Sequence, residues 1–221
     1  HNNNGGNVTP PGTRIVKYGF PTTGLGAVIG IDPQTASAIV GLQTAESLVY
    51  FDPKTRQPIP ALAINATYNP DGLYLDVFLR EGIKFHNGDN MTAQDVKFSY
   101  DRMKVEGLVA GWAPVYERWV DHVEIINDYQ VRIYWKEKGP PRATWLQPII
   151  IPKKYIEEVG WEEWANKPVL TGPFQIVDWE RDNYVHFVKA FPEEGHWYWG
   201  ANNSPNYDEL YIYSVVEPAT R

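Results

Sequence analysis

The chain has 221 residues, of which 43% are hydrophobic, enough for a real core in one large or two modest domains. Its net charge of -7, without any basic run, argues against nucleic acid or an anionic membrane as the main partner, because both bind clustered lysine and arginine. The absence of cysteine excludes disulfides, thiolate catalysis and zinc–thiolate sites.

The first 13 residues are rich in asparagine and glycine, then proline, and cannot bury apolar surface. We expect a disordered lead, either a tether below a membrane anchor or a remnant of an expression tag. Residues 13–20 then predict a strand. A loop with several glycines leads to Asp32 and Pro33, and the apolar spacing of residues 35–51 predicts a helix.

In the middle of the chain the spacing of apolar residues changes from that of a strand to that of a helix, and two glycines lie at the change. Residues 73–80 alternate between apolar and polar, which predicts a strand with two distinct faces. Residues 87–90 read NGDN and predict a turn. Thr92 stands three residues before Asp95, the spacing of a capping box at a helix start. One stripe of that helix is expected to face a core: Val96, Tyr100 and Met103.

The second half of the chain continues this mixed pattern. Residues 120–135 predict two strands joined at Asn127 and Asp128, a good hairpin signal. Pro152 suits the first position of a helix, and a further helical turn is expected at residues 161–165. Three more strands are predicted at residues 172–180, 184–191 and 207–216. The chain is therefore α/β or mixed α+β with a strongly β character.

No pattern of a catalytic or metal site is found in the residues themselves. The histidines are scattered without His-x-x-x-His spacing, so no metal site is predicted, and His86 is expected to make a turn hydrogen bond. Neighbouring carboxylates point apart and indicate solvated faces. The glycines after the first strand lack dinucleotide-loop spacing, so no cofactor is predicted.

Aromatic residues make up 14% of the chain, a high share. Trp112 and Tyr116 lie in one segment, and Trp197 to Trp199 are consecutive aromatics, so some rings are expected at the surface. Exposed rings suit stacking on sugars, peptides or other flat ligands. The alternative is that they cover loops, which the helical spacing favours for Trp161 and Trp164.

The order of these motifs resembles a known family. PIPALA followed by DGLYLDVFLREGIKFHNGDNMTAQDVKFSYDRM is similar to the signature of the family 5 extracellular solute-binding proteins, the peptide, dipeptide and nickel receptors of ABC importers. The segments IDP, IIIPKKYIEEVG, LTGPFQIVDWE and the final stretch continue in the same order, from Arg14 to the last residue. Two places depart from the family pattern: Leu170 replaces the first glycine of a GTGP turn, and AFPEEGHWYWG is longer than usual.

The resemblance implies an α/β (mixed α+β) fold: a type II periplasmic-binding-protein-like lobe with an inserted smaller β-rich domain, the second lobe missing. Family members are much longer, so we expect an N-terminal portion. The expected division is residues 1–13 as the lead, 14–50 as the first part of lobe one, 51–168 as the small extra domain, and 169–221 as the return to lobe one before lobe two.

The resemblance also implies the substrate-binding component of an ABC importer, which binds a peptide or oligosaccharide and delivers it to membrane permease subunits. It implies a monomer without enzyme activity or cofactor. The implied location is periplasmic or extracellular, and the protein could be anchored to the membrane as a lipoprotein. The loop before Asp32 would offer its backbone to the ligand. The expected ligand-binding residues are Ala27, Val28, Ile29, Gly30, Trp112, Tyr116 and Thr171.

Two other classes stay open on the sequence. One is a chemosensory or adhesion module that presents a ligand to a partner. The other is a glycoside hydrolase with two carboxylates across an aromatic cleft.

Overall fold

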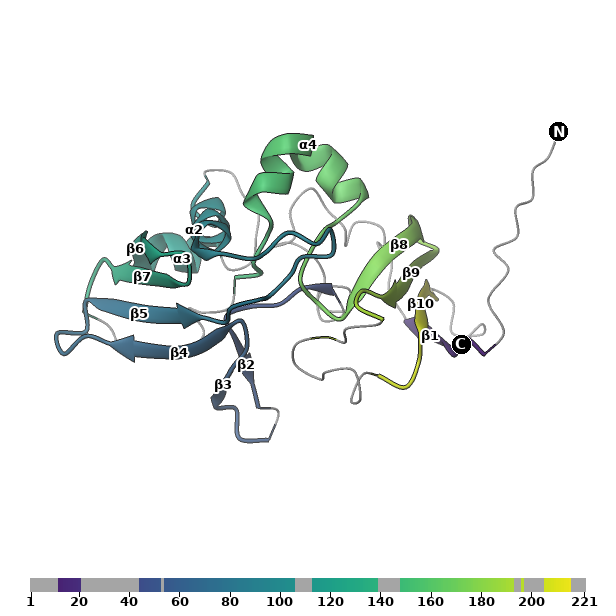
Figure 1. The fold of residues 1–221 in the computed structure, drawn as a ribbon, viewed down its shortest axis with the longest axis horizontal. Helices are drawn as coiled ribbons and strands as arrows, with labels where there is room; N and C mark the ends of the chain where they lie inside the picture. Colours follow the sequence, from purple (N-terminus) through teal and green to yellow (C-terminus); the bar gives the residue numbers. More distant parts are fainter. Residues whose placement is uncertain are drawn as a thin grey trace.

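The computed structural model describes residues 12–20, 44–52, 54–105, 113–138, 148–192, 196 and 205–215. Two four-stranded sheets lie towards opposite ends of the molecule, with α4 above the region between them (Figure 1). The elements in chain order are β1 Ile15–Phe20, β2 Val49–Phe51, β3 Pro58–Pro60, β4 Ala63–Tyr68, β5 Tyr74–Leu79, α2 Ala93–Arg102, α3 Ala113–Trp119, β6 Val120–Asn127, β7 Gln130–Trp135, α4 Lys153–Asn166, β8 Phe174–Glu180, β9 Tyr184–Lys189 and β10 Glu209–Ser214.

The first sheet has the order β4-β5-β7-β6 with antiparallel neighbours throughout. Leu75, Val77 and Leu79 of β5 are buried, while the residues between them are half-buried on the other face. The helix α2 packs against β6 and β7 above the sheet (Figure 1). The strand predicted at residues 73–80 and the hairpin predicted at residues 120–135 are confirmed.

The predicted turn at residues 87–90 and the capping box behind it are both confirmed. The Thr92 hydroxyl accepts a hydrogen bond from the Gln94 N–H, and Asp95 Oδ2 accepts one from the Thr92 N–H at 2.8 Å. The other oxygen of Asp95 accepts the Lys153 N–H at 2.9 Å, at the start of α4. Burial raises the pKa of this carboxyl group. One aspartate therefore satisfies the first turns of two helices.

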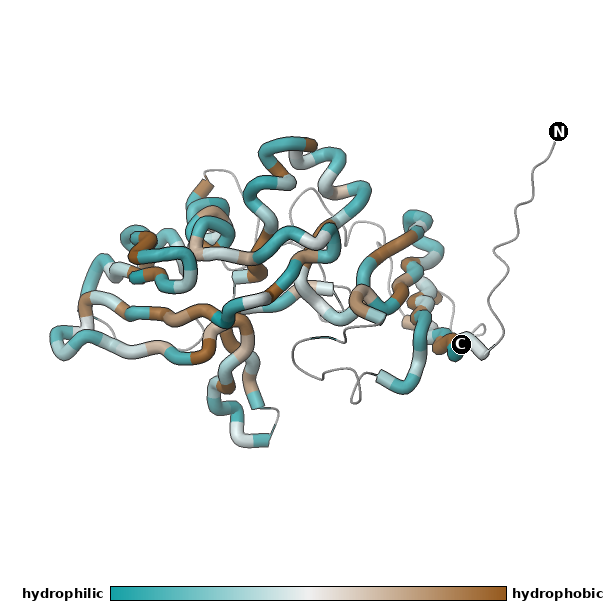
Figure 2. The backbone as a smooth tube through the Cα atoms, in the orientation of Figure 1, coloured by the Kyte–Doolittle hydropathy of each residue, from teal (hydrophilic) through white to brown (hydrophobic). Residues whose placement is uncertain are grey.

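The second sheet has the order β1-β10-β9-β8 and joins distant parts of the sequence. The strand β1 runs parallel to β10, with Ile15 opposite Glu209. Phe174, Val185 and Phe187 are fully buried in the core of this sheet. The hydrophobic colour follows β5 in the first sheet and β8 in the second, whereas most of α4 is hydrophilic (Figure 2).

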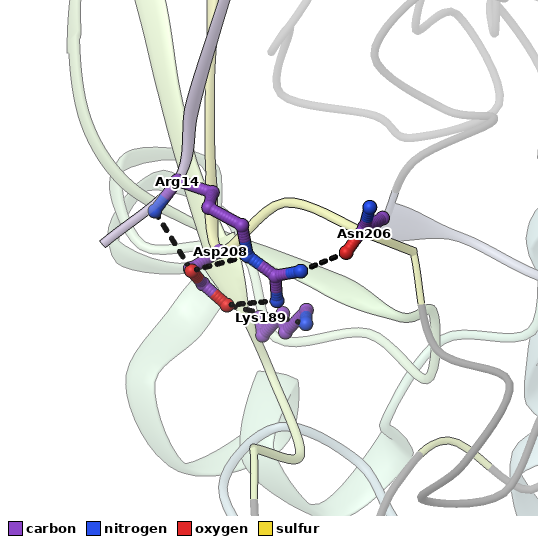
Figure 3. A network of polar contacts seen from close by, with 4 residues as sticks. All are labelled: Arg14, Lys189, Asn206 and Asp208. Carbon is purple, nitrogen blue, oxygen red and sulfur yellow. Dashed lines mark hydrogen bonds and ion pairs between the residues drawn. The ribbon is translucent and has the colours of Figure 1, made fainter. Parts of the chain in front are cut away.

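A charged network closes the end of the second sheet (Figure 3). Asp208 Oδ2 accepts the Arg14 backbone N–H at 2.9 Å, and the Arg14 guanidinium contacts both Asp208 and Asn206. Lys189 Nζ lies 3.3 Å from Asp208 Oδ1. The backbone N–H of Arg14, and then its guanidinium, lower the pKa of Asp208 to about 2. These contacts fix the start of β1 beside the start of β10.

The helix predicted for residues 35–51 is wrong beyond Thr44, which is helical and is the first of these residues that the structure describes. Residues 35–43 lie outside the described residues, and residues 49–51 form β2, which pairs with β3. Leu48 and Val49 are buried in the core of the first sheet. Apolar residues at this spacing suit a helix or a strand, and the antiparallel partner β3 decides the outcome.

The helix predicted after Pro152 is confirmed, although Pro152 is its N-cap and not its first helical residue. Gly160 has φ 83° and ψ 165°, which interrupts the helix. Trp164, beyond this break, is buried. The two predicted helical stretches are thus parts of one bent helix, α4.

Candidate functional site

Five of the seven predicted ligand-binding residues lie outside the described residues: Ala27, Val28, Ile29, Gly30 and Trp112. The structure therefore places only Tyr116 and Thr171. Their roles stay a prediction.

Tyr116 lies on α3 and is 2% exposed. Its ring meets that of Tyr100 on α2 edge-on, with centroids 5.8 Å apart. Both residues belong to the core of the first sheet. Tyr116 therefore joins α3 to α2 and offers almost no surface to a ligand.

Thr171 is 1% exposed and lies in the bend that leads through Pro173 into β8; we call residues 170–172 the 170–172 turn. Its hydroxyl oxygen is buried and has no hydrogen-bond partner among the described residues. A buried hydroxyl without a partner costs free energy, on the order of 1–3 kcal/mol. Thr171 is thus a polar group enclosed where four segments of the chain meet.

Five residues from these four segments form what we call the junction cluster: Thr44, Glu46, His86, Thr171 and His196. The 170–172 turn is held on one side by the segment that leads into β2, because the Gly172 N–H donates to the Thr44 carbonyl at 2.9 Å. A Cβ atom on Gly172 would lie 2.4 Å from the Thr44 carbonyl carbon. The approach of the two backbones therefore requires glycine at position 172.

On the other side, His86 holds the 170–172 turn with three contacts. Its backbone N–H donates to the Leu170 carbonyl at 2.8 Å. Its ring Nε2 lies 2.9 Å from the Gly172 carbonyl oxygen, and the Leu170 N–H donates to ring Nδ1 at 3.4 Å. The turn hydrogen bond expected of His86 is thus made to the 170–172 turn, whose residues lie far along the chain.

Behind His86 lies a buried carboxylate. Glu46 is 1% exposed, and its Oε1 accepts the Tyr50 hydroxyl at 2.7 Å and lies 3.2 Å from His196 Nε2. Loss of hydration lowers the pKa of His86 to about 4, and the neighbouring His196 acts in the same direction. The Gly172 carbonyl and the Glu46 carboxylate oppose that shift without cancelling it.

Sequence reasoning missed the junction cluster. Glu46 fell inside the wrongly predicted helix, and no local pattern indicates that a glutamate is buried. Two signals were available: His86 inside the family signature, and Gly172 inside the TGP turn. Both residues indicate a structurally constrained position, but neither indicates which distant residue it contacts.

Two clefts on the described part of the chain can be placed relative to these residues, and Tyr116 and Thr171 line neither of them. One, of about 300 Å³, lies between β3 and β4 and is mostly apolar, with Pro58, Ile59, Pro60, Ile64 and Tyr68 in its lining. The other, of about 320 Å³, lies between the capping box and α4 and includes Asp89, Asn90, Thr92, Lys153 and Lys154.

Within the described ranges, no three histidine, aspartate or glutamate side chains come together in a way that could hold a metal ion. No helix there has both the length and the apolar character needed to cross a bilayer.

Comparison with known proteins gives the family. The sequence profile described as bacterial extracellular solute-binding proteins, family 5 middle, matches residues 57–221. The chain is 28% identical to di/tripeptide-binding protein 2 of Pseudomonas aeruginosa, over 79% of this chain and 36% of that protein. It is 29% identical to the glutathione-binding protein GsiB of Pectobacterium atrosepticum, over 86% of this chain and 37% of that protein.

Among solved structures, the periplasmic binding protein DppA of Helicobacter pylori, in complex with the peptide STSA, matches with a TM-score of 0.78. The identity is 23%, and the match covers 94% of this chain and 44% of that one. The predicted fold class is confirmed. The chain spans a little over a third of the length of these curated relatives. The family is one of substrate-binding receptors of transporters, and this chain belongs to it: the bacterial extracellular solute-binding proteins of family 5.

Proposed function

We propose that this chain is part of the substrate-binding component of an ABC importer, which captures a small ligand and delivers it to permease subunits in the membrane. The single observation that carries this proposal is the family match over residues 57–221, three quarters of the chain. A receptor of the relatives' full length would close two lobes around the ligand by a hinge motion. Binding is then its whole activity, without bond making or breaking.

The proposed ligand is a short peptide. Two relatives carry the names di/tripeptide-binding and glutathione-binding, and the DppA structure holds a peptide. Extended peptides can be held by backbone hydrogen bonds, which accept many side chains. An oligosaccharide is the second candidate, favoured by the 14% aromatic content.

The predicted ligand-binding residues are part of the proposal, and we call the surface they would form the ligand wall. The loop with Ala27, Val28, Ile29 and Gly30 would present its backbone, and Trp112 would cover one side. Tyr116 and Thr171 are buried, so their proposed part is to support the wall from inside.

The predicted domain boundaries, at residues 50/51 and 168/169, also stay a proposal. The division in two is supported by sheet membership, since β4 to β7 form one sheet while β1 and β8 to β10 form the other. The boundary at 50/51 falls inside β2, whose Val49 packs in the core of the first sheet. Family 5 receptors are extracellular or periplasmic. A lipid anchor on the mature protein, and a monomeric state, are further parts of the proposal; size-exclusion chromatography with light scattering tests the latter.

The test is a thermal-shift screen of a receptor of the relatives' full length that contains this sequence, with dipeptides, tripeptides, glutathione and oligosaccharides. A ligand at about 100 times its Kd should stabilise the receptor by about 2.7 kcal/mol. The 221-residue chain, screened in parallel, should show little or no shift, because one lobe leaves the ligand half solvated. The proposal would be contradicted if none of the peptides and none of the oligosaccharides stabilised the full-length receptor.

A pair of tryptophan variants locates the ligand wall. Trp112→Ala in the full-length receptor should weaken binding at least about tenfold through the loss of a stacked ring. Trp161→Ala is the matched control, because this ring packs on Phe98 and Arg102 and is no part of the proposed wall. Equal effects of the two variants would remove Trp112 from the wall. Hydrolysis of a chromogenic glycoside would favour the hydrolase alternative instead.

A further inference from the structure

His86 joins two turns that lie far apart in the sequence, and both of its ring nitrogens take part. The Gly172 carbonyl oxygen can only accept, so ring Nε2, 2.9 Å away, must carry a hydrogen. The Leu170 N–H can only donate, so ring Nδ1 must be without one. The neutral ring with its hydrogen on Nε2 is the only form that satisfies both partners.

Few of the described charged groups lie near the His86 ring to stabilise an added positive charge. Among the described residues, the titratable groups that face its ring are Glu46 and His196, and Tyr50 donates to Glu46 from behind. His196 lies 3.2 Å from Glu46, so this buried carboxylate already faces a histidine and a phenol. A proton on His86 would therefore be opposed by loss of hydration and by the second histidine, while the Gly172 carbonyl and Glu46 favour it without cancelling that opposition.

We propose that His86 is an acid-sensitive latch: one added proton on its ring places two N–H groups face to face at Leu170, breaks the bond between the Leu170 N–H and the ring, and so weakens the hold on the 170–172 turn. The same turn carries Thr171 and runs directly into β8, so the latch connects the first sheet to the second. Release would loosen the 170–172 turn and, through it, the start of β8, while the core of each sheet stays intact.

Two observations support this latch. Loss of hydration is the main cause that lowers the pKa of His86 to about 4, so the ring is neutral near pH 7, in the form that the two bonds require. Thr171, inside the latched turn, has a buried hydroxyl without a hydrogen-bond partner among the described residues, so the turn is not strongly held by its own side chain. The inference goes beyond the proposed function and requires no ligand.

The experiment uses the 221-residue chain and two histidine-to-glutamine variants. Nitrogen NMR of the histidine rings gives the tautomer and the titration of His86, and amide hydrogen exchange gives the protection of Leu170 and Gly172 at about pH 7 and about pH 4. The amides of Leu79 and Trp135, which donate to carbonyls next to the strands of the first sheet, serve as internal references. In His86→Gln the ring is replaced by an amide that can donate to Gly172 but takes up no proton.

His122→Gln is the matched control, since His122 is 53% exposed on β6 and its ring faces Asp121. We expect the neutral Nε2–H tautomer of His86 at neutral pH. The protection factors of Leu170 and Gly172 should fall at least about tenfold, relative to the references, as His86 gains its proton. The fall should be absent in His86→Gln and unchanged in His122→Gln.

The proposal is overturned if the same fall occurs in His86→Gln, if His86 gains its proton without any loss of protection, or if the ring carries its hydrogen on Nδ1 at neutral pH. Should His86→Gln not fold, the wild-type titration decides alone, because the tautomer and the coupling between proton uptake and protection are both measured there.

Discussion

Gly172 lies so close to Thr44 that a Cβ atom on residue 172 would stand 2.4 Å from the Thr44 carbonyl carbon and 2.6 Å from its oxygen. The Gly172 N–H donates to that same oxygen at 2.9 Å. Both partners are backbone atoms, so no side-chain rotation can relieve a clash. The meeting of the 170–172 turn with the segment before β2 therefore depends on the missing side chain.

Gly172→Ala should lower the free energy of unfolding by about 1–3 kcal/mol, because the added methyl group must push two backbones apart. Urea unfolding followed by circular dichroism measures this difference. Gly82→Ala is the control: its Cβ would meet no atom within 4 Å, but its φ of +77° should still cost about 1 kcal/mol. A Gly172→Ala protein as stable as the wild type would show that the junction can widen freely.

Asp95 should matter more for stability than any other acidic residue of α2, because it serves both α2 and α4. Asp95→Ala removes the reciprocal bond to Thr92 and leaves the Lys153 N–H without its acceptor, with an expected loss of about 2 kcal/mol. Asp101→Ala on the same helix removes only an exposed ion pair with Lys97 and should cost less than about 0.5 kcal/mol. Urea unfolding of the two variants side by side checks the ranking.

The elements that sequence reasoning predicted correctly are those with local causes. The strand β5 follows from the alternation of its own residues, and α2 follows from Thr92 and Asp95, three residues apart. The hairpin of β6 and β7 follows from a turn pair at its tip. In each case the determining residues are neighbours in the sequence, so the physics can be evaluated without knowing the fold.

The junction cluster could not be predicted because its causes are distant in the sequence. Whether Glu46 is buried, and whether residues 49–51 form a strand, depends on β3 and on the 170–172 turn. The partners of His86 lie 84 and 86 positions further along the chain. The resemblance to a family marked these segments as special without giving the contacts between them.

Asp208 should make the stability of the chain sensitive to pH at the acid end of the range. Its pKa in the folded protein, about 2, is below its usual value, so the stabilisation is present above pH 4 and is lost as the pH falls from about 4 to about 2. The carboxyl side chain is 35% exposed, so the effect should stay below about 1 kcal/mol.

Thermal unfolding at several pH values between about 4 and about 2 measures the contribution of Asp208. Asp208→Asn should remove this part of the pH dependence. Arg14→Ala should remove only some of it, because the largest cause is the Arg14 backbone N–H, which remains in the variant. If Arg14→Ala abolished the dependence completely, the guanidinium and not the main chain would be the principal partner.

His86 should give a second and separate pH window. Its folded-state pKa, about 4, lies below the usual value of about 6.5, so the unfolded chain takes up the proton first as the pH falls. Stability is therefore present above pH 6.5 and is lost between about pH 6.5 and about pH 4. The loss should be at most about 3 kcal/mol, and less to the extent that the partly buried residue keeps contact with solvent.

The measurement is the free energy of unfolding in urea at about pH 7 and about pH 4.5 for the wild type, His86→Gln and His122→Gln. The wild type and His122→Gln should lose stability together over this interval, and His86→Gln should lose clearly less. This window lies above that of Asp208, so the two contributions separate on the pH axis. Equal losses in all three proteins would mean that another group takes up the proton, with His86 a structural contact and no more.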